Sequence, residues 1–161
     1  MNLQPFFRPP LFWLLRMLPG LLAKKIYGPQ RITKNILIDL RPRGDQLAID
    51  FRTTEGSLWL TVRNGSPFPV DLDRLSVDLW CSSRLGMITL LNRIQIASSE
   101  PEDVLVRGLL LADCGRLAMQ RADSTYCTAE VRAEFDSNVG RFVVKHRLDG
   151  IKPSFQNTPV S

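Results

Sequence analysis

The feature that most constrains the fold is an alternation of apolar and polar residues that begins near Ile36 and continues to His146. Successive side chains of a β-strand point to opposite faces, so this period predicts strands with one buried and one solvated face. Clusters of turn-forming residues at 43–45, 55–57, 64–67 and 136–140 separate the apolar runs. The pattern predicts an antiparallel β-sandwich of seven or eight strands, preceded by an N-terminal hydrophobic helical segment. A one-residue slip near Asp73-Arg74 predicts a bulge.

The chain of 161 residues has the length of one domain with short extensions. We expect a membrane-contact or docking segment at 1–32, a sandwich at 33–151 and a flexible tail at 152–161. The linker candidate is Gly28–Thr33, and the tail is rich in Pro, Ser and Asn. Residues 115–124 interrupt the strand pattern and predict a helical turn or a long loop.

Charge is distributed unevenly along the chain. Residues 1–43 contain eight basic side chains and one acidic side chain, whereas the remainder contains thirteen basic and fifteen acidic side chains. A basic block beside a nearly neutral domain indicates an anionic partner for the block.

The basic block also contains an apolar run, Leu11–Ala23, which Arg16 and Pro19-Gly20 interrupt. As a helix it would rise about 20 Å, which is short of the ~30 Å hydrocarbon core of a bilayer. An interfacial segment fits this pattern better than a transmembrane helix. The residues expected to contact the membrane are Arg8, Leu11, Phe12, Trp13, Leu14, Leu15, Arg16, Leu18, Leu21, Leu22, Lys24, Lys25 and Tyr27.

Three other interpretations of this segment differ in the support that the sequence gives them. A secretory signal peptide is disfavoured because Arg16 breaks the apolar region and no small-x-small cleavage site follows. Packing of the segment on its own domain or on a partner subunit stays open. Nucleic-acid binding has little support because the aromatic residues do not alternate with the basic ones.

In the run from Leu58 to Leu79, Val62-Arg63-Asn64 precedes a proline-containing turn, and an apolar alternating strand follows it. This run resembles the type-2 late-embryogenesis-abundant domain, also called the water-stress and hypersensitive-response domain. Residues 94–110 and the hairpin 129–145 also match the family pattern, so the resemblance covers roughly residues 33–151. Two departures are Gly65-Ser66 between Asn64 and Pro67, and residues 115–124, which have no counterpart. The resemblance implies a fibronectin/immunoglobulin-like sandwich, membrane-associated lipid- or protein-contacting roles and no catalytic residues.

The Asn64 motif has a structural interpretation. An Asn side chain closes turns through its amide and tolerates left-handed backbone angles, and prolines stiffen the exit from a turn. We therefore expect Asn64, Gly65, Pro67 and Pro69 to form a structural turn.

The sequence offers little for catalysis. The single histidine, His146, lies on a predicted strand, and Cys81, Cys114 and Cys127 are far apart without a zinc-binding spacing. We expect Cys81 and Cys127 to lie in the core. We expect the carboxylates of Asp71/Asp73 and Glu130/Glu134 to bind cations at most weakly. We expect no enzyme activity, no catalytic residue, no metal site, no cofactor and no small-molecule substrate.

Together these features predict a non-enzymatic, membrane-associated binding or assembly protein whose N-terminal segment anchors a β-sandwich to an anionic membrane surface. The alternative is an accessory structural subunit of a larger membrane complex, with the segment docked on partner subunits. An excess of Arg over Lys and basic residues beside the apolar run favour the cytoplasmic face of a bacterial inner membrane.

Overall fold

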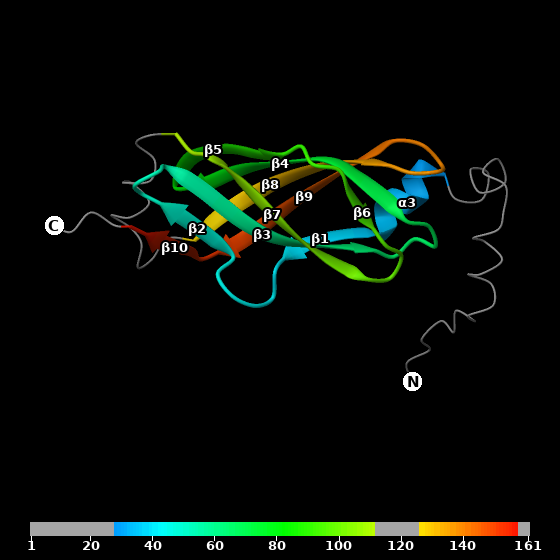
Figure 1. The fold of residues 1–161 in the computed structure, drawn as a ribbon, viewed down its shortest axis with the longest axis horizontal. Helices are drawn as coiled ribbons and strands as arrows, with labels where there is room; N and C mark the ends of the chain where they lie inside the picture. Colours follow the sequence, from blue (N-terminus) through cyan, green and yellow to red (C-terminus); the bar gives the residue numbers. More distant parts are fainter. Residues whose placement is uncertain (1–27, 112–125, 158–161) are drawn as a thin grey trace.

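A computed structural model describes residues 28–111 and 126–157 (Figure 1). These residues form one short helix and ten strands. The elements in chain order are α3 (Pro29–Asn35), β1 (Ile36–Leu40), β2 (Leu47–Asp50), β3 (Glu55–Asn64), β4 (Val70–Cys81), β5 (Ser83–Leu90), β6 (Ile94–Ile96), β7 (Pro101–Leu109), β8 (Cys127–Asp136), β9 (Phe142–Ile151) and β10 (Pro153–Gln156).

The strands form two five-stranded sheets that pack face to face, which confirms the all-β sandwich prediction. In the first sheet, β3 pairs with β7 along one edge and with β1 and β2 in succession along the other, and β10 adds to β2. In the second sheet, β4 pairs with β8 on one side and with β5 and β6 on the other, and β9 adds to β8. Every pairing is antiparallel except that of β10 with β2.

The alternation in the sequence becomes the burial pattern of the strands. In β8 every second side chain from Cys127 to Phe135 is buried, and the intervening Glu130 and Arg132 are exposed. The inward side chains of both sheets form one continuous core. The predicted irregularity near Asp73 is confirmed by a register shift between Leu72 and Arg74 where β4 pairs with β8.

The N-terminal boundary of the sandwich lies earlier than the sequence predicts. Residues 29–35 form α3 instead of an open linker, with Pro29 in its first turn and the Thr33 hydroxyl donating to the Pro29 carbonyl at 2.8 Å. Ile32 is completely buried in the core. A boundary between residues 32 and 33 would therefore cut through the packed domain, and Gly28 is the better starting point.

The C-terminal prediction also needs correction. Residues 153–156 were expected in a flexible tail, but they form β10, which pairs with β2. The Ser154 hydroxyl donates to the Leu47 carbonyl at 3.2 Å, and the Phe155 ring lies 5.5 Å from that of Phe51. The backbone groups of β10 pair with the open edge of β2. The Pro-, Ser- and Asn-rich composition by itself predicted that they would be hydrated instead.

The remaining predicted segments lie outside the described residues. All the expected membrane-contact residues, from Arg8 to Tyr27, belong to this part of the chain, as do Cys114 and residues 115–124. Within residues 28–111 and 126–157, no helix has both the length and the hydropathy needed to cross a bilayer. The helix α3 lies at one end of the sandwich and β10 at the other (Figure 1).

Candidate functional site

The turn between β3 and β4 is held by the side chain of Asn64, which is buried. Its amide nitrogen donates to the Phe68 carbonyl at 2.7 Å and to the Ile96 carbonyl at 3.3 Å. Its amide oxygen accepts the Ser66 backbone N–H at 3.0 Å and lies 2.6 Å from the Ser66 hydroxyl. Asn64 thus closes the turn through its side chain and also connects it to β6.

The other residues of this turn are packed closely. A Cβ at Gly65 would lie 3.1 Å from the Asn35 carbonyl oxygen, which already accepts the Gly65 N–H at 2.9 Å. Pro67 is buried and Pro69 is half-buried. Asn64 does not have a positive φ, so left-handed tolerance has no part in its role. The geometry of this turn is that of a structural element.

Charged side chains gather on the outer face of β4, β8 and β9, which we call the charged face. Its residues line a shallow hollow of about 710 Å³ and include Arg74, Ser76, Asp78, Glu130, Arg132, Glu134, Lys145, His146 and Arg147. These side chains occupy the outward positions of neighbouring strands or, for His146, lie at the rim. Antiparallel pairing places Glu130 opposite Arg147 and Arg132 opposite Lys145.

Most cations on and beside this face are paired. Arg84 contacts Asp78 at 2.8 Å, and this carboxylate raises the pKa of Arg84. Arg132 contacts Glu134 at 3.2 Å, and Arg147 contacts Asp149 at 3.0 Å. These pairs are exposed to solvent, so each contributes little to stability and mainly fixes the direction of the side chains.

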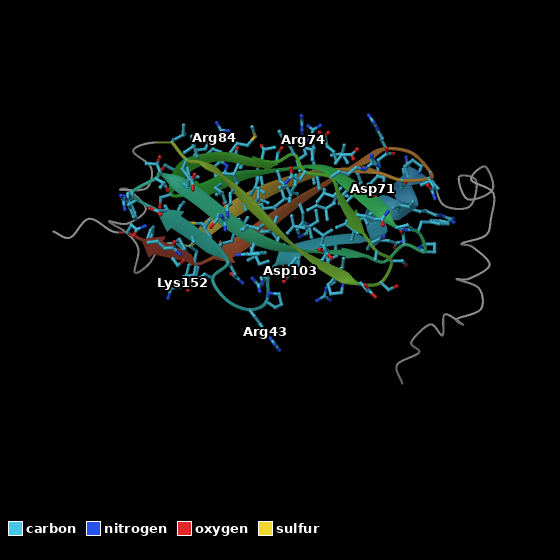
Figure 2. The ribbon with its side chains drawn as sticks, viewed as in Figure 1. Arg43, Asp71, Arg74, Arg84, Asp103 and Lys152 are labelled. Atoms are coloured by element: carbon cyan, nitrogen blue, oxygen red, sulfur yellow. The ribbon has the colours of Figure 1, made fainter. Side chains whose placement is uncertain are left out.

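Two cations of the charged face differ from the others. Arg74 and Lys145 are exposed and form no ion pair within residues 28–111 and 126–157. Figure 2 shows Arg74 and Arg84 on the same side of the molecule, above β4 and β5. On the charged face, Arg74 and Lys145 are therefore the cations available to an anionic group on a partner.

The carboxylate pairs are occupied by arginines. Arg93 contacts Asp71 at 2.6 Å and Asp73 at 3.5 Å, and Asp71 raises the pKa of Arg93. Asp103 contacts Arg41 at 3.1 Å and accepts the Thr61 hydroxyl at 2.7 Å. The described residues contain no group of three or more His, Cys, Asp or Glu that could hold a metal ion.

The opposite sheet has a second, smaller hollow of about 400 Å³ on its outer face. The guanidinium of Arg41 lies 4.6 Å from the centre of the Trp59 ring, where cation–π attraction holds it. Arg107, Asp50 and Gln156 also line this hollow. Its wall is polar and mixed in charge, as on the charged face.

His146 and the described cysteines match no catalytic arrangement. His146 is exposed on β9 beside the charged face, and no hydrogen bond in the part of the chain that the structure describes joins it to a serine, cysteine or carboxylate. Cys81 and Cys127 are buried, as the sequence predicts.

Sequence reasoning missed Arg74 and Lys145 as candidate binding residues. Both occupy polar positions of an alternating strand, which is the only signal the sequence contains for them. The strand register that places them on one face is set by tertiary pairing. The sequence therefore predicts a solvated face without indicating which of its cations lack partners.

No protein-family model matches the chain, and no curated protein matches it either. Solved structures with a similar fold include a candidate late embryogenesis abundant (LEA) protein, with 12% identity, coverage of 88% of this chain and 82% of that chain, and a TM-score of 0.49. A protein from Arabidopsis thaliana has 16% identity, coverage of 75% and 81%, and a TM-score of 0.44. A protein from Archaeoglobus fulgidus has 11% identity, coverage of 71% and 90%, and a TM-score of 0.45. Identities of this size describe a likeness of fold and not of function.

Proposed function

We propose that this protein is a non-enzymatic, membrane-peripheral binding or assembly protein. The observation that carries the proposal is the sequence of residues 1–27, where an apolar run too short to span a bilayer is flanked by Arg8, Lys24 and Lys25. A segment of this kind binds through apolar burial together with attraction to anionic headgroups. The resemblance of residues 33–151 to the type-2 late-embryogenesis-abundant domain supports the same class of role.

The position of Gly28 supports the assignment of anchor and binding surface to different parts of the chain. Gly28 is the N-cap residue of α3, which lies at one end of the sandwich (Figure 1), so a membrane anchor attached there would leave the outer faces of both sheets open to other molecules. The charged face, with Arg74 and Lys145, is then the surface that a polar or anionic protein partner would contact. We place the protein at the cytoplasmic face of a bacterial inner membrane.

The test is co-sedimentation with vesicles of neutral phosphatidylcholine and of phosphatidylcholine mixed with phosphatidylglycerol. The full chain is compared with a chain that begins at Gly28, because Ile32 is buried and a start at Thr33 would remove a core side chain. We expect only the full chain to bind, and to bind anionic vesicles more tightly at low salt. Equal binding by both chains, or none by the full chain, would contradict the proposed anchor.

A charge-neutralised variant sharpens the test. Each basic residue near an anionic surface contributes about 1 kcal/mol, so Lys24→Gln with Lys25→Gln should weaken binding to anionic vesicles roughly 30-fold at low salt. The matched control is Arg52→Gln with Lys152→Gln, which removes the same charge from exposed positions of the sandwich. Figure 2 shows Lys152 at the β10 end, away from α3. A similar loss in both variants would indicate a nonspecific effect of net charge.

The second candidate function is that of an accessory subunit in a larger membrane complex, and the unpaired Arg74 and Lys145 favour it. In this case the N-terminal segment docks on protein. The full chain then co-purifies with a defined partner from detergent-solubilised membranes and does not bind protein-free vesicles.

A further inference from the structure

Two buried cysteines lie opposite each other at one end of the second sheet. Cys81 is the last residue of β4 and Cys127 is the first residue of β8. In the β4–β8 register, Leu79 pairs with Ala129 and Trp80 pairs with Thr128, so the next position places Cys81 opposite Cys127. Both side chains point into the core, with exposed fractions of 1% and 0%.

The two thiols influence each other's ionisation. Interaction with Cys127 lowers the pKa of Cys81, and interaction with Cys81 together with burial raises the pKa of Cys127. Directly opposed residues of antiparallel strands have Cα atoms about 4.5–5.5 Å apart, within the roughly 4.4–6.8 Å range of disulfides. A bond between the sulfurs therefore requires rotation of the side chains and no displacement of the backbone.

We propose that Cys81 and Cys127 are an oxidisable pair that forms a cross-strand disulfide under peroxide or by exchange with a small-molecule disulfide. With hydrogen peroxide, the Cys81 thiolate attacks one peroxide oxygen, which gives a sulfenic acid and releases hydroxide that takes up the thiol proton as water. The Cys127 sulfur then attacks the sulfenic sulfur, and the hydroxyl leaves as a second water. The pair loses two protons and two electrons, and the peroxide gains them as it is reduced to two waters.

The position of the pair allows a small oxidant to reach it. Both cysteines terminate their strands, and strand ends open locally at lower free energy than the middle of a sheet. The β4–β5 connection beside Cys81 is a tight turn at Ser82, whose φ is 60°. Within residues 28–111 and 126–157 the buried hydroxyl of Ser83, the first residue of β5, has no hydrogen-bond partner, which is an unfavourable polar burial next to this turn. In a reducing cytosol the pair remains two thiols, and disulfide formation marks exposure to an oxidising environment.

The test uses the folded full chain, treated with hydrogen peroxide or oxidised glutathione, alkylated and analysed by non-reducing peptide mass mapping. We expect a loss of about 2 Da, a linked peptide pair that contains Cys81 and Cys127, and reversal by dithiothreitol. The oxidised protein should also unfold at a temperature about 5–10 °C higher, because the new bond closes a long loop. A Cys114→Ser variant should retain the same linkage, since the remaining cysteines suffice.

Matched controls use Cys81→Ser and Cys127→Ser in the Cys114→Ser background. Each variant should lose the 2 Da change and gain an oxygen adduct or remain unmodified. The proposal is overturned if Cys81 and Cys127 of the folded protein both remain free thiols, detected by alkylation, after treatment with oxidant. It is also overturned if the disulfides formed involve Cys114, or if only intermolecular disulfides appear. Because the mapping is done on the wild-type chain, a variant that fails to fold does not prevent the test.

Discussion

Substitution of the buried Asn64 by alanine should destabilise the sandwich more than the same substitution of an exposed asparagine. The side chain makes its hydrogen bonds in a buried turn, so its removal leaves the Ser66 N–H without its acceptor and the Ile96 carbonyl without this donor. The Phe68 carbonyl keeps the Ser66 hydroxyl, 2.9 Å away. The orphaned Ser66 N–H at about 1–3 kcal/mol and the two lost hydrogen bonds to carbonyls at about 0.5–1.5 kcal/mol each give an expected loss of about 3 kcal/mol in the free energy of unfolding.

The assay is equilibrium unfolding in urea, followed by circular dichroism and tryptophan fluorescence, with a thermal melt as a second measure. A loss of about 3 kcal/mol corresponds to a decrease of roughly 6–12 °C in the melting temperature of a domain of this size. The control is Asn92→Ala, which makes the same chemical deletion in an exposed loop and should change stability by less than about 0.5 kcal/mol. If the two variants lost equal stability, the Asn64 hydrogen bonds would not be what holds the turn.

Asn64→Asp extends this test to pH. An aspartate at this position would face the Phe68 and Ile96 carbonyls, so burial and repulsion would raise its pKa in the folded state. Because the pKa of this aspartate is higher in the folded state than its unfolded value of about 3.9, the variant is least destabilised at low pH, where the side chain is protonated. It loses stability as pH rises and the buried carboxyl ionises. The deficit relative to wild type should therefore be larger at pH 7 than at pH 4, and a deficit independent of pH would contradict the reasoning.

Further predictions concern the core. Gly108→Ala should destabilise by about 1–3 kcal/mol because the new Cβ would lie 3.0–3.4 Å from Ile88, whereas Gly28→Ala, with nothing within 4 Å, should be nearly neutral in the same urea titration. Ile32→Ala should cost about 2–5 kcal/mol, and a chain that begins at Thr33 should melt lower than one that begins at Gly28. Equal melting temperatures for the two truncated chains would place Ile32 outside the cooperative core.

The strand pattern and the Asn64 turn could be predicted from sequence because both depend on local information. Alternation decides which side chains face a core, and the Asn64 amide reaches backbone groups only a few residues away. The bulge near Asp73 was visible for the same reason, as a slip in the period. The cation pairs were not predictable, because Arg93 meets Asp71 through a contact across 22 positions of the chain.

The sequence by itself determined that the chain forms a β-sandwich and that residues 1–27 are apolar and basic. Only the tertiary structure decided where the domain begins and ends, since Ile32 is buried by packing against the sheets and β10 exists because the edge of β2 was open to it. The opposition of Cys81 and Cys127 also required the register of β4 and β8. Local periodicity determines which face of a strand each side chain occupies, whereas pairing between distant segments determines which side chains lie next to each other. The candidate sites of this protein depend on the second.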